Sequence, residues 1–336
     1  MTMTDIARDS IDMKLLGDWQ RDLPLVPRPF AVLAAHLETS EPDVINRLKR
    51  LCRSGAVSRV GGVVRPNVIG ASTLAAMAAP DLQVEEIAAV IGEEPGVNHS
   101  YLRENKQNLW FVVTGPDRDH VTQSLARISK RAGRRVFDLR LERSYHIDLG
   151  FPLDGWGAKH CEAIDAPARC AAFEPRQGDA QLMQALTHGL PLGPYPFRSI
   201  AEALGRSESS VIARLTQLRA AEVITRLGVI VRHRALGWRS NAMVVWDVRP
   251  DGIDRAGATL AAIPGVNLCY RRTRLKGEWP YNLYCMVHAK ARADALKIIT
   301  LASEAARLTD CPRQILFSSR CFKQTGAMLT APKEAA

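Results

Sequence analysis

The sequence predicts an α+β protein in which two tandem copies of a winged helix-turn-helix are each followed by a ferredoxin-like βαββαβ domain. Three observations predict this fold. The sequence repeats internally, each copy starts with two short helical segments, and each continues with strands and helices in the order β-α-β-β-α-β. Two such copies in one chain predict a fused pseudo-dimer.

The repeat is clearest between residues 22–70 and 189–237, which align without a gap at a constant shift of 167, with 20 identities in 49 positions. It resumes after gaps, because Pro-Gly-Val-Asn occurs at both 95–98 and 264–267. From the repeat we predict an N-terminal tail (1–20), winged helix-turn-helix domains (21–70 and 181–237), ferredoxin-like domains (71–151 and 238–326), a linker (152–180) and a C-terminal tail (327–336).

The first copy shows why each element is expected. Residues 30–37 form a short amphipathic pattern, and residues 40–55 form a second one with Ser40 as N-cap and Gly55 as its end. Residues 56–66 alternate as strand, turn and strand, which is typical of a wing. The ferredoxin-like pattern follows as strand 74–80, helix 84–94, strands 97–105 and 108–115, helix 120–133 and strand 136–149. The second copy has the same order, with strand 241–248, helix 252–263, strands 266–274 and 281–289, helix 291–308 and strand 314–323.

The composition excludes several classes of protein. With 46% hydrophobic and 24% charged residues, and no apolar run long enough to span a membrane, the chain reads as soluble and globular. Its acidic start lacks the features of a secretory signal, so we expect a cytoplasmic protein with no membrane partner. Seven cysteines without a C-x-x-C pair argue against a disulfide framework, a zinc ribbon and a four-thiolate iron–sulfur cluster.

The positive charge is concentrated in the second half of the chain. Residues 1–150 carry 20 basic and 19 acidic side chains, whereas residues 151–336 carry 25 and 16, which together give the net charge of +10. An anionic partner is therefore expected, such as a polycarboxylate ligand or nucleic acid. DNA is the less favoured one, because the start of the second helix, which reads bases in this motif, carries Glu41, Asp43 and Glu208. These acids also suit a helix N-terminus.

Several short motifs narrow the family. LPLVPRPF (23–30) and LPLGPYPF (190–197) precede the two helical pairs, and the wings read SRVGG (58–62) and TRLGV (225–229). VNHSYLRE (97–104), SYHIDLGF (144–151) and WPYNLYCMVH (279–288) follow in the ferredoxin-like regions. Together these motifs resemble the siroheme decarboxylases, an offshoot of the Lrp/AsnC fold, and the chain resembles a fusion of the NirD and NirL subunit types from residue 16 to residue 325.

The resemblance implies a carboxy-lyase. Siroheme would lose the carboxylates of its acetate arms at C12 and C18 as carbon dioxide and give didecarboxysiroheme, in heme d1 or heme b synthesis. It implies no organic cofactor and no metal beyond the iron of the substrate. Other enzymes of the same pathway and further copies of the chain are the expected partners.

A site for such a substrate needs arginines for its carboxylates, flat apolar surfaces for its macrocycle and a proton donor. His99, Tyr101 and Arg103 alternate along one strand and therefore share a face. His146, at the end of the last strand of this copy, is assigned by the family motif to the same site. We predict His99 and His146 as proton donors or carboxylate clamps, or as axial ligands of the substrate iron; the alternative is that both are ordinary core histidines.

The second copy differs at both positions, because Leu268 replaces His99 and Lys323 replaces His146. The two copies are therefore not expected to be equivalent. The remaining predicted substrate-binding residues recur between the copies or lie beside the motifs. They are Arg59, Tyr101, Arg103, Asn108, Arg226, Arg232, His233, Arg272, Tyr281, Asn282, His288 and Lys323.

Each of these residues also has a structural interpretation. The recurring arginines can form fold-specific ion pairs, and the two asparagines can cap turns. The loop at 274–279, which is five residues longer than its counterpart in the first copy, is as compatible with a plain insertion as with a lid. Two other classes of function stay open: a DNA-binding regulator that senses a tetrapyrrole or other small anion, and a non-catalytic tetrapyrrole carrier.

Overall fold

The computed structural model describes residues 9–147, 150 and 173–331, except for the side chain of His233. The chain divides into two units. The described parts of Met1–Ile69 and Arg169–Gly237 form a winged-helix unit, and those of Gly70–Leu149 and Trp238–Ala336 form a sheet unit. Each unit thus contains the matching domains of both copies. The predicted linker lies largely outside the described residues.

The winged-helix unit contains the predicted helix-turn-helix pairs and one further helix in each copy. Its elements are α2 (Ser10–Gly17), η1 (Asp18–Gln20), α3 (Pro29–His36), α4 (Glu41–Arg53), β1 (Val57–Val64), α7 (Asp179–His188), α8 (Pro196–Ala203), α9 (Glu208–Ala220), β7 (Ile224–Val231) and η3 (His233–Leu236). The interpretation of residues 1–20 as a tail is wrong for its described part, because Leu15 and Leu16 in α2 are fully buried. The repeat extends to this helix, since Asp12 ion-pairs with Arg47 and Asp179 with Arg214.

The wings differ from the prediction. Each wing is one continuous strand rather than a hairpin, and β1 pairs antiparallel with β7 of the other copy. The two glycines Gly61 and Gly228 face each other at the centre of this pair. A Cβ atom at Gly61 would lie 2.6 Å from the carbonyl oxygen of Leu186, and one at Gly228 would lie 2.5 Å from the backbone of Gln20. Close backbone packing explains why glycine recurs here.

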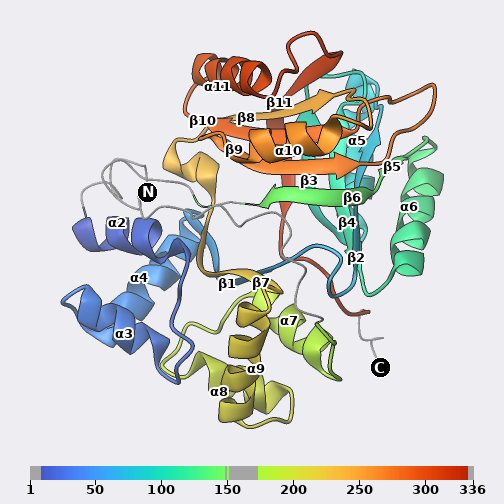
Figure 1. The fold of residues 1–336 in the computed structure, drawn as a ribbon. Helices are drawn as coiled ribbons and strands as arrows, with labels where there is room; N and C mark the ends of the chain where they lie inside the picture. Colours follow the sequence, from blue (N-terminus) through green and yellow to red (C-terminus); the bar gives the residue numbers. More distant parts are fainter. Residues whose placement is uncertain (1–8, 148–149, 151–172, 332–336) are drawn as a thin grey trace. The chain divides into compact units, whose positions relative to one another are not determined.

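The sheet unit is built on nine strands in the order β5-β2-β4-β3-β11-β8-β10-β9-β6 (Figure 1). Its first-copy elements are β2 (Ala71–Met77), η2 (Asp81–Gln83), α5 (Val84–Glu93), β3 (Val97–Arg103), β4 (Leu109–Gly115), α6 (Arg118–Ala132), β5 (Phe137–Leu139) and β6 (Leu141–Ile147). Its second-copy elements are β8 (Ser240–Trp246), α10 (Ile253–Ala261), β9 (Val266–Arg272), β10 (Leu283–Ala289), α11 (Arg292–Ala305) and β11 (Arg313–Gln324).

The two copies exchange the ends of their last strands. The strand predicted at 136–149 is interrupted at Arg140: β5 pairs with β2 of its own copy, whereas β6 pairs with β9 of the other copy. In the same way β11 pairs with β8 through its first half and with β3 through its second half (Figure 1). Because only one residue separates the two edge strands β5 and β6, the sheet must curl so that its edges approach each other.

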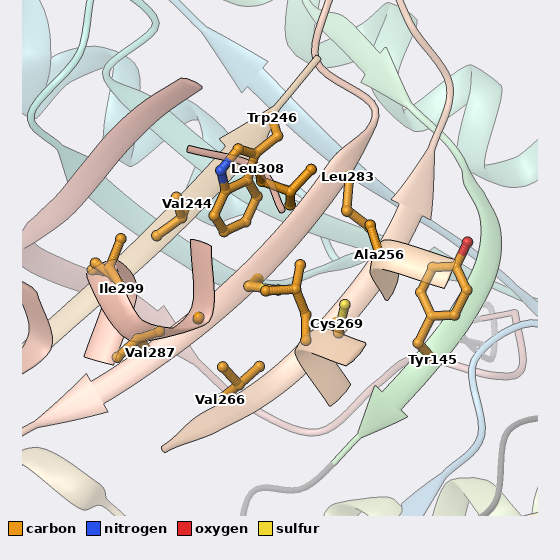
Figure 2. Packing of buried hydrophobic residues seen from close by; sticks show 14 of the residues in the cluster. Tyr145, Val244, Trp246, Ala256, Val266, Cys269, Leu283, Val287, Ile299 and Leu308 are labelled. Carbon is orange, nitrogen blue, oxygen red and sulfur yellow. The ribbon is translucent and has the colours of Figure 1, made fainter. Parts of the chain in front are cut away.

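Three apolar clusters hold this unit together. Helices α5 and α6 cover the first-copy strands through residues such as Ile91, Phe111 and Ile128. Helices α10 and α11 cover the second-copy strands, and Figure 2 shows this cluster around Trp246, with Tyr145 of β6 contributed by the other copy. The third cluster lies on the opposite face of the strands and joins both copies. We call this second face the inner face.

No helix among the described residues combines the length and the apolar character needed to span a membrane.

Candidate functional site

The inner face of β3 carries the three polar side chains that alternation predicts together. Tyr101 lies opposite Trp110, which belongs to the inner cluster, whereas the intervening Ser100 lies opposite Phe111 on the helix-covered face. The rings of His99 and Tyr101 stack with their centroids 6.4 Å apart. The guanidinium carbon of Arg103 lies 5.5 Å from the centroid of the Tyr101 ring. A histidine, an aromatic plane and an arginine thus form one continuous surface.

Arg103 extends from the first copy into the second. The residue is 5% exposed, and its guanidinium donates through Nη1 to the carbonyl oxygen of Leu316 at 3.0 Å and to the side-chain oxygen of Asn241 at 3.2 Å. Asn241 in turn lies opposite His288 on β10 and is hydrogen-bonded to it. We call the pairing of β3 with residues 318–324 of β11 the first junction.

The pairing of β9 with β6 forms a second junction with the same plan and different chemistry. Leu268, Tyr270 and Arg272 occupy the positions of the first-junction His, Tyr and Arg. Arg272 donates through Nη1 to the carbonyl oxygen of Leu139 at 3.0 Å, which matches the bond from Arg103 to Leu316. Both recurring arginines therefore donate to a backbone carbonyl oxygen of the strand that crosses between the copies.

Arg272 is also enclosed by aromatic rings. Its guanidinium carbon lies 5.1 Å from the ring centroid of Tyr270 and 5.9 Å from that of Tyr284. Burial lowers the pKa of Arg272 and raises the pKa of Tyr270 to about 12. Its Nε atom has no hydrogen-bond partner among the described residues.

The longer loop of the second copy is anchored in the inner cluster by one aromatic side chain. It carries Trp279 into the inner cluster, where the side chain is 4% exposed. The Trp279 ring packs against Trp110 at 5.3 Å and against Tyr281 at 4.9 Å, and its Nε1 donates to the hydroxyl of Tyr284 at 2.7 Å. The insertion therefore fills space next to the tyrosine that covers Arg272. Tyr281, predicted to bind substrate, forms part of this aromatic packing.

His146 does not join His99. It lies on β6, and four strands separate β6 from β3 in the sheet. A bulge between Ser144 and His146 places His146 opposite Cys269, whose side chain faces α10 on the helix-covered face. The last strand crosses to the other copy, which sequence spacing does not reveal, and the sheet order therefore sets His146 apart from His99. One site that contains both histidines stays a prediction.

Lys323, the counterpart of His146, also points away from the inner face. It lies opposite Ser100, and its ammonium donates to the carbonyl oxygens of Gly92 at 2.6 Å and Glu94 at 3.4 Å, at the end of α5. Burial lowers the pKa of this ammonium. Its predicted role in substrate binding is therefore replaced by a helix-capping role.

The paired asparagines cap turns rather than orient a ligand. The Asn108 amide accepts from the backbone nitrogen of Ala79 and donates to its carbonyl oxygen, both at 2.8 Å. Asn282 makes the same two bonds to Val248, at 2.9 and 3.0 Å. Both amides are used by the backbone, which corrects their assignment as substrate-binding residues.

The predicted wing residues belong to the winged-helix unit. Arg226 is 9% exposed, and burial lowers the pKa of Arg59, which lies on the paired strand. Arg232 is exposed and follows the strand end, while the His233 side chain is outside the described residues. Arg59, Arg226, Arg232 and His233 therefore belong to a different unit from His99.

Each helix that would read DNA has one arginine that is paired internally. In α4, Asp43 accepts from Thr39 at 2.9 Å and from Arg47 at 2.6 Å, and Arg47 also bonds Asp12 of α2. In α9, Arg214 is 8% exposed and is paired with Asp179. These two arginines hold an additional helix instead of presenting their charge to phosphate.

Sequence reasoning missed Asn241 and Trp279, and it missed Asp12 and Asp179 as repeated partners of arginines. The constant shift of 167 relates the two aspartates, so the repeat itself held that signal. Asn241 had no such signal, because Ser72 stands at the equivalent position of the first copy.

Within the described residues, no group of three or more His, Cys, Asp or Glu side chains is arranged to hold a metal ion.

The fold and its inner-face site define a two-copy protein of the AsnC-like class. The model of the AsnC-like ligand binding domain matches residues 69–146 and 235–323, and that of the siroheme decarboxylase NirDL-like HTH domain matches residues 12–57 and 179–224. The chain is 51% identical over 324 residues to the siroheme decarboxylase NirDL subunit of Paracoccus denitrificans, which covers 96% of this chain and 98% of that one. The chain belongs to the siroheme decarboxylase family.

Further relatives agree with this assignment. The siroheme decarboxylase of Hydrogenobacter thermophilus is 30% identical over 93% of this chain and 92% of that one. A crystal structure of the siroheme decarboxylase NirDL matches with a TM-score of 0.65 and 26% identity, over 95% of this chain and 94% of that one. A second crystal structure, of NirDL with an iron-uroporphyrin III analogue, matches with a TM-score of 0.63 and 25% identity, over 97% and 94%.

Proposed function

We propose that this protein is a cytoplasmic siroheme decarboxylase that removes the acetate carboxylates at C12 and C18 of siroheme and gives didecarboxysiroheme for heme d1 synthesis. The observation that carries the proposal is the 51% identity to a siroheme decarboxylase subunit over nearly the whole of both chains. The first junction adds the chemistry that the reaction needs, because it places arginine, tyrosine and histidine side by side.

At each arm the bond between the methylene carbon and the carboxylate breaks. Carbon dioxide leaves, the bonding electron pair stays on the carbon, and one proton converts that carbon to a methyl group. Arg103 binds a substrate carboxylate through its fork of N–H groups, and the Tyr101 ring covers the edge of the macrocycle. His99, half-buried on the same face, donates the proton, because imidazole is the side chain whose ordinary pKa suits proton transfer near neutral pH.

Two features favour this function over DNA binding. Arg47 of α4 and Arg214 of α9 hold α2 and α7, and the wing strands pair with each other instead of forming separate hairpins. A non-catalytic tetrapyrrole carrier is the competing function that the experiment must distinguish.

The test is anaerobic incubation of the purified full-length chain with siroheme, followed by mass spectrometry of the extracted tetrapyrrole. Loss of two carboxyl groups as carbon dioxide is the expected result. Siroheme that is bound and recovered unchanged would identify a carrier. Siroheme that is recovered unchanged, together with an affinity for duplex DNA that falls steeply with salt, would identify a regulator.

A further inference from the structure

We propose that Asn241, His288 and Asn267 form a hydrogen-bonded relay that fixes the Arg103 guanidinium for the substrate carboxylate. In this proposal His288 is a positioning residue and not a proton donor. The inference rests on the proposed function, because it assigns a role toward the same substrate.

The relay is continuous and buried. Asn241 accepts from Nη1 of Arg103 at 3.2 Å, and its side-chain nitrogen lies 2.8 Å from Nε2 of His288. Nδ1 of His288 lies 3.0 Å from the side-chain oxygen of Asn267, which also accepts from the backbone nitrogen of His288 at 3.3 Å. Arg103, Asn241 and His288 are 5%, 3% and 3% exposed. Water is therefore largely excluded from the relay.

The direction of every bond follows from Arg103. A guanidinium only donates hydrogen bonds, so the atom of Asn241 facing it is the oxygen, and the Asn241 nitrogen must donate to His288. Nε2 of His288 is then an acceptor, and its proton is on Nδ1, where it is donated to Asn267. The arginine thus selects one neutral tautomer of His288, and a proton on Nε2 would break the bond to Asn241.

A relay of neutral groups suits an arginine that must bind an anion. A carboxylate partner would orient Arg103 equally well, but it would neutralise the guanidinium and compete with the carboxylate of the substrate. The amide oxygen of Asn241 and the carbonyl oxygen of Leu316 fix its orientation without cancelling its charge.

The relay serves only one of the two recurring arginines. In the first copy, Ser72 and Thr114 pair with each other at the positions that Asn241 and His288 occupy in the second copy. The Thr114 hydroxyl instead donates to the carbonyl oxygen of Gly96 and accepts from the backbone of Met328. The relay therefore supports the arginine of the first junction, which also carries His99.

Two substitutions of matched polarity separate a positioning role from a merely structural one. His288→Gln places an amide oxygen near the position of Nε2 and keeps an acceptor for Asn241. His288→Asn reaches only the position of Nδ1 and keeps the contact to Asn267. We expect the Asn variant to raise the KM for siroheme about tenfold with a smaller change in kcat, and the Gln variant to stay within about threefold of wild type.

A double-mutant cycle shows whether His288 acts through Arg103. In an Arg103→Lys background, which loses the fork geometry, His288→Asn is expected to add less than about twofold to KM. Thr114→Val, at the equivalent position of the other copy, is the control and should leave KM unchanged. Thermal unfolding of each variant shows whether a rise in KM is accompanied by lost stability.

Three results would overturn the relay while siroheme turnover by wild type keeps the proposed function intact. The first is an equal effect of His288→Asn and His288→Gln on KM. The second is full additivity of the effects of Arg103→Lys and His288→Asn on KM. The third is loss of kcat in both His288 variants. The last result would make His288 a proton donor. Absence of turnover in wild type is a different outcome, which refutes the proposed function itself.

Discussion

The first and second junctions are built on the same backbone plan, yet they differ on the inner face, where Leu268 of the second junction stands in place of His99 of the first. Both have an arginine that donates to the crossing strand at 3.0 Å and a tyrosine two residues before it. At the first junction the arginine meets a polar relay and shares its face with His99. At the second junction the arginine is covered by tyrosines, with Trp279 packed beside them. Duplication thus supplied one architecture, and substitution of a few inner-face residues separated a candidate reactive half from a structural half.

The largest expected effect is on the proton donor. His99→Ala should lower kcat for loss of carbon dioxide by about 10²- to 10⁴-fold, which is the usual contribution of a general acid, with a much smaller change in KM. Its matched control is Leu268→Ala at the second junction, which removes packing but no proton donor. Single-turnover assays by mass spectrometry would measure both. Equal kcat in wild type and His99→Ala would refute the assignment of His99.

A comparison of His99 with His146 shows how much of the candidate site could be predicted from the sequence. Alternation correctly placed His99, Tyr101 and Arg103 on one face, because that property depends on a single strand. It could not locate His146, because the strand after Arg140 leaves its own copy and pairs with β9. Strand partners depend on contacts across the whole unit, which a local pattern does not contain.

The same limit explains the other corrections. The wing pattern at 56–66 fits a hairpin and a single strand equally well, and only the pairing of β1 with β7 decides between them. Asn108 and Asn282 recur at equivalent positions, and recurrence alone does not distinguish a ligand from a turn cap. The fold class was predictable because it follows from periodicity and repeat, whereas the assembled site depends on sheet register.

The second expected effect concerns the stability of the second junction. Trp279→Ala should lower the free energy of unfolding by about 3–5 kcal/mol, because it removes a buried aromatic side chain and its bond to Tyr284. Denaturation in urea would measure this loss, with Leu82→Ala as a control at a fully exposed position. A stable Trp279→Ala protein with an altered KM for siroheme would instead restore the interpretation of the loop as a lid.

The third expected effect distinguishes the two arginines. Arg103→Lys should raise the KM for siroheme about tenfold, because lysine lacks the planar fork that binds a carboxylate through two bonds. Arg272→Lys should leave KM unchanged and lower stability, because Arg272 bonds Leu139 and packs between two tyrosines. Steady-state kinetics and urea denaturation of both variants give the comparison. Equal increases in KM would show that both junctions bind substrate.

The smallest expected effect is at Lys323, which lies in the first junction but caps α5 and does not reach the inner face. Lys323→Met should leave KM and kcat unchanged and cost about 1–3 kcal/mol of stability near neutral pH, through loss of charged hydrogen bonds to the carbonyl oxygens of Gly92 and Glu94.

The pH dependence of stability provides a second check on Lys323. Burial lowers the pKa of the folded-state ammonium below its ordinary value of 10.5, so the unfolded chain binds this proton more tightly than the folded protein does. The contribution of Lys323 to stability should therefore increase as pH rises from the folded-state pKa to 10.5, and Lys323→Met should lack that increase. Urea denaturation of both proteins over this alkaline range isolates the difference, because the buried tyrosines titrate alike in the two chains. A Lys323→Met variant with weakened siroheme binding would instead show that the first junction extends beyond its inner face.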